Sequence, residues 1–253
     1  MKKVLGYLLA ICLITTFTAC SDDDDKDTNE LVGTWNLQEI IKNTDNSFQS
    51  GSLFLIWETQ AGTTINGIDV NTLSGIVEPT GSLVLAQTLR DITFLENGTI
   101  TATYSDAGVD LENPVAPTWK TASGYATYKI KNQKLYVFPN YEKFKTSGNT
   151  EGLDINNIIN SLGNLSDIGN LTAGMDILNN GIPVNYTIAA DNSAKFYIDK
   201  ELVMKILPLV KLYAESLDNS TENAQIKAIV KELDSVFAKT TKFEIGLNLV
   251  KAK

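Results

Sequence analysis

The chain has 253 residues, 43% of them hydrophobic, which is enough apolar material for one large β domain or two small ones. With 21 basic and 30 acidic residues its net charge is −9. This charge argues against a nucleic-acid partner, because phosphate binding needs Lys and Arg. The sequence has no histidine and only two cysteines, Cys12 and Cys20. It therefore lacks the most common general base and metal ligand, and a zinc site or disulfide within the mature chain is not expected.

Residues 1–19 are typical of a secretion signal. Lys2 and Lys3 precede an apolar run from Val4 to Ile14, which is too short to span a bilayer stably. The run leads to Phe17-Thr18-Ala19-Cys20. This tetrapeptide resembles the lipobox of bacterial lipoproteins and implies cleavage before Cys20, lipidation of Cys20, and membrane attachment through the acyl chains. The alternative is an ordinary signal that is cut elsewhere and leaves a free thiol.

Residues 20–30 form a short acidic segment. Asp22–Asp25 follow Ser21 directly, and closely spaced carboxylates repel one another and stay solvated, so we predict a flexible linker. The segment resembles the acidic export signal of Bacteroidetes surface lipoproteins. The resemblance implies an outer-membrane protein exposed at the cell surface, and the alternative is a plain spacer.

The first strand signals follow the linker. Within residues 31–42, Trp35 and Leu37 alternate with polar residues, the pattern of a half-buried strand. Residues 52–57 form a short apolar run. The stretch rich in Gly, Thr and Asn that continues to Gly81 predicts weak strands at most, and we expect another short strand at residues 82–86.

Three hairpins are predicted next. The first joins residues 91–95 to 99–104 through Asn97-Gly98, a strong hairpin turn because both residues tolerate a positive φ. The second joins 125–130 to 134–138, and the third joins 184–189 to 194–198. Short strands joined by tight turns indicate an antiparallel barrel or sandwich.

Helical patterns follow the second hairpin and the third. Residues 152–181 predict broken helices packed on the barrel or across its mouth. Residues 200–217 and 221–238 carry apolar stripes at helical spacing, with Pro208 expected to kink the first. The chain then alternates cleanly over 242–249, and pairing this last strand with the first would close the sheet.

These patterns resemble the lipocalin-like lipoproteins of unknown function from Bacteroidetes. The resemblance rests on Leu31-Val32-Gly33-Thr34-Trp35, the hairpin at Asn97-Gly98, Tyr128-Lys129-Ile130 and Leu135-Tyr136-Val137. It implies a mainly β fold, an antiparallel lipocalin-like (calycin-type) barrel over residues 31–253, and a helix before the last strand suits this topology. The helical insertion near 152–181 and the helix pair near 200–238 are additions that lipocalins usually lack. The resemblance also implies that Trp35 packs across the closed end. An eight-stranded barrel is filled by side chains or holds one small ligand, and these alternatives stay open.

The chain offers no nucleophile–base pair, and we expect no catalytic residue, cofactor or metal. Paired carboxylates in a glycosidase, or a calcium loop, are the remaining options near Asp106, Asp110 and Glu112, but acidic residues in such turn-rich segments are normally only solvated. Glu58 and Glu78 are equally unremarkable. Asp234-Ser235-Val236 resembles the O-glycan acceptor of exported Bacteroides proteins, which makes Ser235 a candidate for modification.

The sequence therefore predicts a non-enzymatic surface lipoprotein whose barrel binds a small apolar or amphipathic ligand. The aromatic residues of the hairpins motivate this hypothesis; they are Trp119, Tyr125, Tyr128, Tyr136 and Phe138. The alternative is an interaction module with a filled barrel, an accessory subunit that docks another envelope protein or a glycan.

Overall fold

A computed structural model describes residues 30–111, 113–140, 143, 180–217 and 220–253 of the chain. The predicted signal peptide, nearly all of the acidic linker and residues 152–179 of the predicted insertion lie outside these residues. Those predictions are therefore not tested by the structure.

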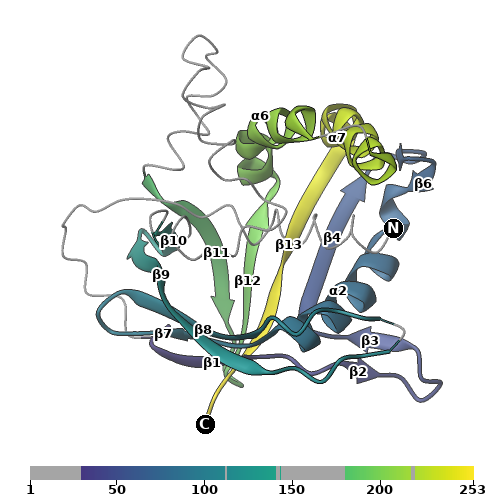
Figure 1. The fold of residues 1–253 in the computed structure, drawn as a ribbon. Coiled ribbons are helices and arrows are strands. Elements are labelled where there is room, and N and C mark those ends of the chain that lie inside the picture. Colours follow the sequence, from purple (N-terminus) through teal and green to yellow (C-terminus); the bar gives the residue numbers. More distant parts are fainter. Residues whose placement is uncertain (1–29, 112, 141–142, 144–179, 218–219) are drawn as a thin grey trace.

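Eight antiparallel strands form a closed barrel (Figure 1). Their order around the barrel is β1, β7, β8, β9, β10, β11, β12 and β13, and β13 pairs back onto β1. The strands are β1 Gly33–Leu37, β7 Leu89–Phe94, β8 Thr99–Ser105, β9 Trp119–Lys131, β10 Lys134–Pro139, β11 Ile182–Ile188, β12 Ser193–Asp199 and β13 Thr240–Lys251. The lipocalin-like barrel predicted from the sequence is thus confirmed.

Strand β13 has two neighbours along one of its edges. Near its C-terminal end it pairs with β1, with Trp35 opposite Lys251 and Leu37 opposite Leu249. Towards its N-terminal end it pairs with β4 (Leu53–Thr59), with Leu55 opposite Ile245. The predicted closure of first strand on last strand is confirmed. Most of the short apolar run at residues 52–57 lies in β4, which adds a ninth strand to the same sheet.

Three α-helices are described, together with a short 3-10 helix and two small hairpins. They are α2 Ser74–Thr88, α6 Lys200–Ser216, α7 Thr221–Lys239, η1 Val70–Thr72, β2 Ile41–Lys42 with β3 Phe48–Ser50, and β5 Thr64–Ile65 with β6 Ile68–Asp69. In Figure 1, α6 and α7 lie together at one end of the barrel, and α2 runs beside β4. The side chains of Asp199 and Ser220 cap α6 and α7 by accepting from the backbone N–H of Leu202 and Asn223. The helix pair before the last strand was predicted.

The strand predicted at residues 82–86 is wrong, because these residues form the last turns of α2. The preceding stretch does contain the weak strands β5 and β6, but its second half is the start of the same helix. Both faces of α2 carry apolar side chains, so its sequence has no clear period of 3.6. A short apolar run of this kind does not distinguish a buried strand from a helix.

The three predicted hairpins are present. Their turns use residues with positive φ, namely Gly98 (78°), Asn132 (52°), Gln133 (60°) and Asn192 (63°). Glycine and asparagine adopt this conformation with little steric cost, which is why the turn sequences identified the hairpins.

Side chains of η1 and α2 cap the free edge of β4. The backbone N–H groups of Leu53, Leu55 and Thr59 donate to Ser82 Oγ (3.1 Å), Glu78 Oε1 (2.8 Å) and Asn71 Oδ1 (3.0 Å), respectively. Ser82 and Glu78 are four residues apart, so they lie on one face of the helix. The edge of the sheet is therefore covered without another strand.

Two hydrophobic clusters form the main core. One lies among the barrel strands and includes Trp35, Phe94, Tyr128 and Phe196. The other joins β4 and β13 to the helix pair and includes Phe237 and Phe243, with Trp57 packed against it.

Candidate functional site

Aromatic side chains fill the closed end of the barrel. Trp35 is fully buried, and its indole N–H donates to the Leu31 carbonyl oxygen at 2.8 Å. Its ring meets Phe196 edge-on at 6.0 Å, and Phe196 stacks on Phe94 at 5.6 Å. Tyr128 meets Phe94 edge-on at 5.1 Å. This aromatic floor confirms that Trp35 is a structural residue.

Above this floor, the inward-facing side chains are apolar but only half-buried. Val137 shares a face of β10 with buried Leu135, and Val184 shares a face of β11 with buried Ile182, because alternate residues of a strand face the same side. The half-buried apolar residues that pack against the floor cluster are Leu37, Ile92, Ile100, Val137, Val184, Tyr186, Ile188 and Leu247. These inward-facing apolar side chains are thus only partly buried.

The hairpin aromatics that motivated the binding hypothesis do not line the lumen together. Of the five, only Tyr128 belongs to the barrel core cluster. Tyr136 and Phe138 alternate with inward-facing Leu135 and Val137, so they face outward. The Arg90 guanidinium carbon lies over the Trp119 ring, 5.8 Å from the ring centroid. The inner face of the barrel strands instead carries mainly aliphatic residues, which the sequence analysis did not single out as ligand contacts.

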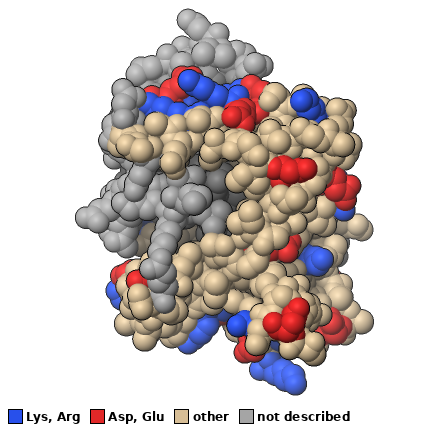
Figure 2. All heavy atoms as spheres, turned by 90° about the vertical axis from the view of Figure 1, so that its right-hand side faces the viewer, with Lys and Arg blue, Asp and Glu red and all other residues tan. Residues whose placement is uncertain are grey.

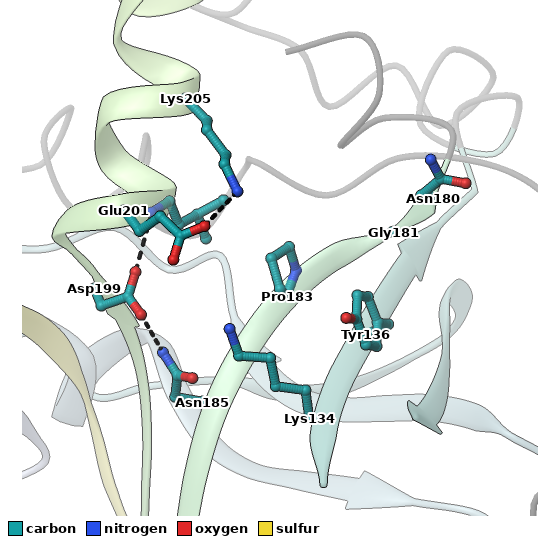
Figure 3. A pocket seen from close by; sticks show the side chains of 10 residues that line it. Lys134, Tyr136, Asn180, Gly181, Pro183, Asn185, Asp199, Glu201 and Lys205 are labelled. Carbon is teal, nitrogen blue, oxygen red and sulfur yellow. Dashed lines mark hydrogen bonds and ion pairs between the residues drawn. The ribbon is translucent and has the colours of Figure 1, made fainter. Parts of the chain in front are cut away.

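A pocket, here called the outer pocket, lies on the outer face of β10, β11 and β12, next to the start of α6 (Figure 3). Its volume is about 320 Å³. The residues that line it are Lys134, Tyr136, Asn180, Gly181, Pro183, Asn185, Asp199, Glu201, Leu202 and Lys205. Most of them are polar, so the outer pocket differs in chemistry from the barrel interior.

The acidic side chains of the outer pocket already have partners. Asp199 accepts from the Leu202 backbone N–H at 3.0 Å and from Asn185 Nδ2 at 2.8 Å. Glu201 accepts from Lys205 Nζ at 2.6 Å. The Lys205 ammonium, first by this hydrogen bond and then by its charge, lowers the pKa of the Glu201 carboxyl below its usual value. Glu201 is therefore ionised near neutral pH and held by Lys205.

The carboxylates considered in the sequence analysis do not converge on a site. Asp106 pairs with Lys120 at 2.6 Å, Asp110 Oδ1 accepts from the Asn113 N–H, and Glu78 caps β4. Glu58 is exposed, and Glu112 lies outside the described residues. Within the described ranges, no group of three or more acidic, His or Cys side chains is placed to hold a metal ion.

Ser235 lies exposed on α7, and its hydroxyl donates to the Glu232 carbonyl oxygen at 2.8 Å. Its neighbour Asp234 forms an ion pair with Lys211 of α6. The hydroxyl is thus accessible, and its glycosylation stays a prediction.

The face shown in Figure 2 carries acidic and basic side chains scattered over a largely uncharged surface, with a group of basic residues towards the top. Neither sign of charge dominates this face. None of the helices in the part of the chain that the structure describes has the length and apolar character needed to cross a membrane.

Taken together, the described elements define a lipocalin-like closed β-barrel with an aromatic floor, an apolar inner wall and a helix pair before the last strand. Comparisons with protein-family models, with curated proteins and with solved structures found no match to this chain.

Proposed function

We propose that the barrel binds one small apolar or amphipathic ligand between its aromatic floor and the helix pair. The observation that carries the proposal is the half-buried apolar inner wall, represented by Val137, Val184 and Leu247. Burying the remaining accessible surface of these side chains against a ligand contributes about 25 cal/mol per Å² of apolar area. The rigid floor beneath them, built on Trp35 and Phe196, limits the cost of ordering the site.

The test uses an apolar fluorescent probe, N-phenyl-1-naphthylamine, and the full-length chain. Val184→Trp places a large ring inside the lumen, and we expect the Kd of the probe to rise by about tenfold or more, which corresponds to about 1.4 kcal/mol. Thr187→Trp is the matched control, because Thr187 is exposed on the opposite face of the same strand.

Circular dichroism verifies that both variants keep their strand content. Equal probe binding by the two tryptophan variants would place the probe outside the barrel and contradict the proposal. Absence of any bound small molecule in native mass spectrometry of protein purified from its host would also count against it.

We also propose that the mature protein is a lipoprotein anchored to the outer membrane, at the cell surface, through Cys20. The support is the lipobox-like Phe17-Thr18-Ala19-Cys20 and the acidic segment after it. Two or three acyl chains anchor a protein far more firmly than one, at about 0.8 kcal/mol for each buried methylene. Metabolic labelling with an alkyne fatty acid should label the wild type and Cys12→Ser but not Cys20→Ser. Label that persists in Cys20→Ser would disprove the anchor.

The interaction-module hypothesis has one observation in its favour. Ile76 and Leu83 of α2 are seven residues apart on one side of the helix and are 52% and 45% exposed. Crosslinking on intact cells tests this second candidate, and Ile76→Lys with Leu83→Lys should remove the crosslinked partner while leaving probe binding in the barrel unchanged.

A further inference from the structure

We propose that the outer pocket on β10, β11 and β12 is a second binding site, for a small sugar that carries one carboxylate. This site is separate from the barrel interior. Leu135 and Val184 face the core, so their neighbours in sequence, Lys134, Tyr136 and Pro183, face the other side of the sheet. The proposal therefore does not depend on an apolar ligand in the lumen.

The size of the outer pocket suits a ligand of one or two rings. Its volume of about 320 Å³ lies at the low end of the roughly 300–1,000 Å³ found for small-molecule sites. Figure 3 shows side chains from β10, β11, β12 and α6 around one hollow, with Lys134 directed into it. Four elements thus contribute to the walls.

Lys134 supplies the positive charge of the proposed site. Its side chain is half-buried, and among the described residues it has no ion-pair partner. Lys134 interacts electrostatically with the Glu201 carboxylate, but Glu201 already forms an ion pair with Lys205 at 2.6 Å. A partly desolvated ammonium gains from a carboxylate, and a charge-assisted hydrogen bond is about twice as strong as a neutral one. A carboxylate on the ligand fits this position.

The remaining groups suit hydroxyls rather than a second charge. The Tyr136 hydroxyl forms no hydrogen bond with the described residues. The Asn185 amide nitrogen donates to Asp199, and its carbonyl oxygen accepts no hydrogen bond from the described residues. Both groups can bond to sugar hydroxyls, which donate and accept. The rings of Tyr136 and Pro183 add apolar surface for the C–H face of a sugar.

An amino acid fits the pocket less well than an acidic sugar does. Its ammonium group would need a free carboxylate, but Asp199 accepts two hydrogen bonds and Glu201 is paired with Lys205. Breaking these bonds to bind a cation would leave a donor or a charge without its partner. We therefore commit to an acidic sugar and use the amino acid as a competitor.

Isothermal titration calorimetry of the full-length chain with D-glucuronate, D-glucose and glycine tests the site. We expect glucuronate to bind about tenfold more tightly than glucose, since the two differ mainly in the carboxylate that Lys134 would bind. Lys134→Met should lower the affinity for glucuronate to about that for glucose and so remove this preference. Lys195→Met is the matched control. Lys195 is an exposed residue of β12 outside the pocket, so its replacement removes the same charge without changing the pocket lining.

Tyr136→Phe, which deletes only the hydroxyl, should weaken binding of both sugars by about fivefold, the effect of one lost hydrogen bond. Three results would overturn the proposal: no sugar binding at millimolar concentration, equal binding of glucuronate and glucose, or the same loss of glucuronate binding in Lys134→Met and Lys195→Met. Stronger binding of glycine than of glucuronate would also overturn it. The naphthylamine probe should bind Lys134→Met normally, so failure here is distinct from failure of the barrel proposal.

Discussion

The two halves of β13 pair with different neighbours. Its C-terminal part pairs backbone to backbone with β1 and closes the barrel. Its N-terminal part pairs with β4, and the other edge of β4 is covered by the side chains of Ser82, Glu78 and Asn71. A backbone ladder tolerates many side chains, whereas a capped edge depends on a few particular residues. Both halves of β13 are thus held by backbone pairing, and they differ in what lies beyond the neighbour: β1 pairs onward with β7, whereas β4 ends in an edge covered by side chains.

One tryptophan lies near each half of β13, and the two differ in how far along the chain their hydrogen-bond partners lie. The indole N–H of Trp35 donates to Leu31, four residues away, and that of Trp57 donates to Thr240 Oγ1 at 3.0 Å, 183 residues away. Trp57 also stacks on Phe237 of α7 at 5.4 Å and meets Phe243 edge-on at 5.0 Å. At the closed end, the tryptophan is thus bonded to a residue close to it in sequence. At the helix end, the tryptophan contacts α7 and β13, which lie far from it in sequence.

Truncating the two tryptophans should give the largest effect. Trp35 is fully buried, so Trp35→Ala is expected to lower the free energy of unfolding by about 3–5 kcal/mol. Trp57 is only half-buried, and Trp57→Ala should cost less. Urea titration followed by circular dichroism measures both losses, and an equal or greater loss for Trp57→Ala would show that the helix end dominates stability.

Gly246 lies where β13 has β12 on one side and β4 on the other, and it should tolerate no side chain. A Cβ there would lie 2.0 Å from the Phe196 carbonyl oxygen and 2.7 Å from Tyr197 Cα. We expect Gly246→Ala to destabilise the protein by about 1–3 kcal/mol or more. Gly75 in α2 has open space around its Cβ position, and Gly75→Ala should instead stabilise by about 0.5–1 kcal/mol. Thermal unfolding separates the two signs, and a neutral Gly246→Ala would contradict this account of the strand.

Glu78 tests whether the edge of β4 depends on individual caps. Glu78→Leu removes the acceptor for the Leu55 N–H, and we expect a loss of about 1–3 kcal/mol in urea titration because a buried donor is left unpaired. Glu78→Gln keeps an acceptor oxygen at the same place and should stay close to the wild type. If the two variants were equally stable, the cap would contribute nothing to the edge.

Tyr128 gives the smallest expected effect and a pH dependence. Its hydroxyl donates to the Leu95 carbonyl oxygen at 2.9 Å, so Tyr128→Phe should cost about 0.5–1.5 kcal/mol near neutral pH. Burial, with a smaller contribution from the Glu96 charge, raises the pKa of the phenol above its usual value. A raised pKa in the folded state favours the neutral phenol, so this stability is full below the unfolded pKa of about 10 and is lost as the pH rises through the folded pKa.

The difference in stability between the wild type and Tyr128→Phe should therefore shrink from about pH 8 to about pH 11, on either side of the unfolded tyrosine pKa. Urea titrations at the two pH values measure it. A difference that grew with pH would mean that the ionised phenol is favoured in the folded state.

The closed end could be predicted from the sequence and the capped edge could not. The hairpin turns at Asn97-Gly98 and Asn192, and the alternation leading to Leu249, are local patterns that fix strands and turns. The caps on β4 join residues 12 to 29 positions apart and require knowledge that residues 82–86 are helical. A helix that is apolar on both faces, with Pro79 inside it, lacks the periodicity that would have revealed it.

The outer pocket was missed for a related reason. Lys134 and Glu201 are far apart in the chain and meet only because β10, β11 and β12 lie side by side before α6 begins. A weak signal was available, since Tyr136 is an aromatic residue at an outward-facing position of its strand. The sequence analysis based the proposed ligand site on the hairpin aromatics rather than on Val137 and Val184, because sequence alone does not show which inward-facing positions stay partly accessible.

The pairing of the first and last strands of the barrel also delays the completion of the fold. Trp35 and its partner Lys251 are separated by roughly 200 residues, and translation adds about 5–20 residues per second. Strand β1 must therefore wait on the order of 10–40 seconds after its own synthesis before its final neighbour exists. Throughout that interval its hydrogen-bonding edge is unprotected, so a nascent chain of this protein has reason to be shielded by a chaperone until β13 arrives.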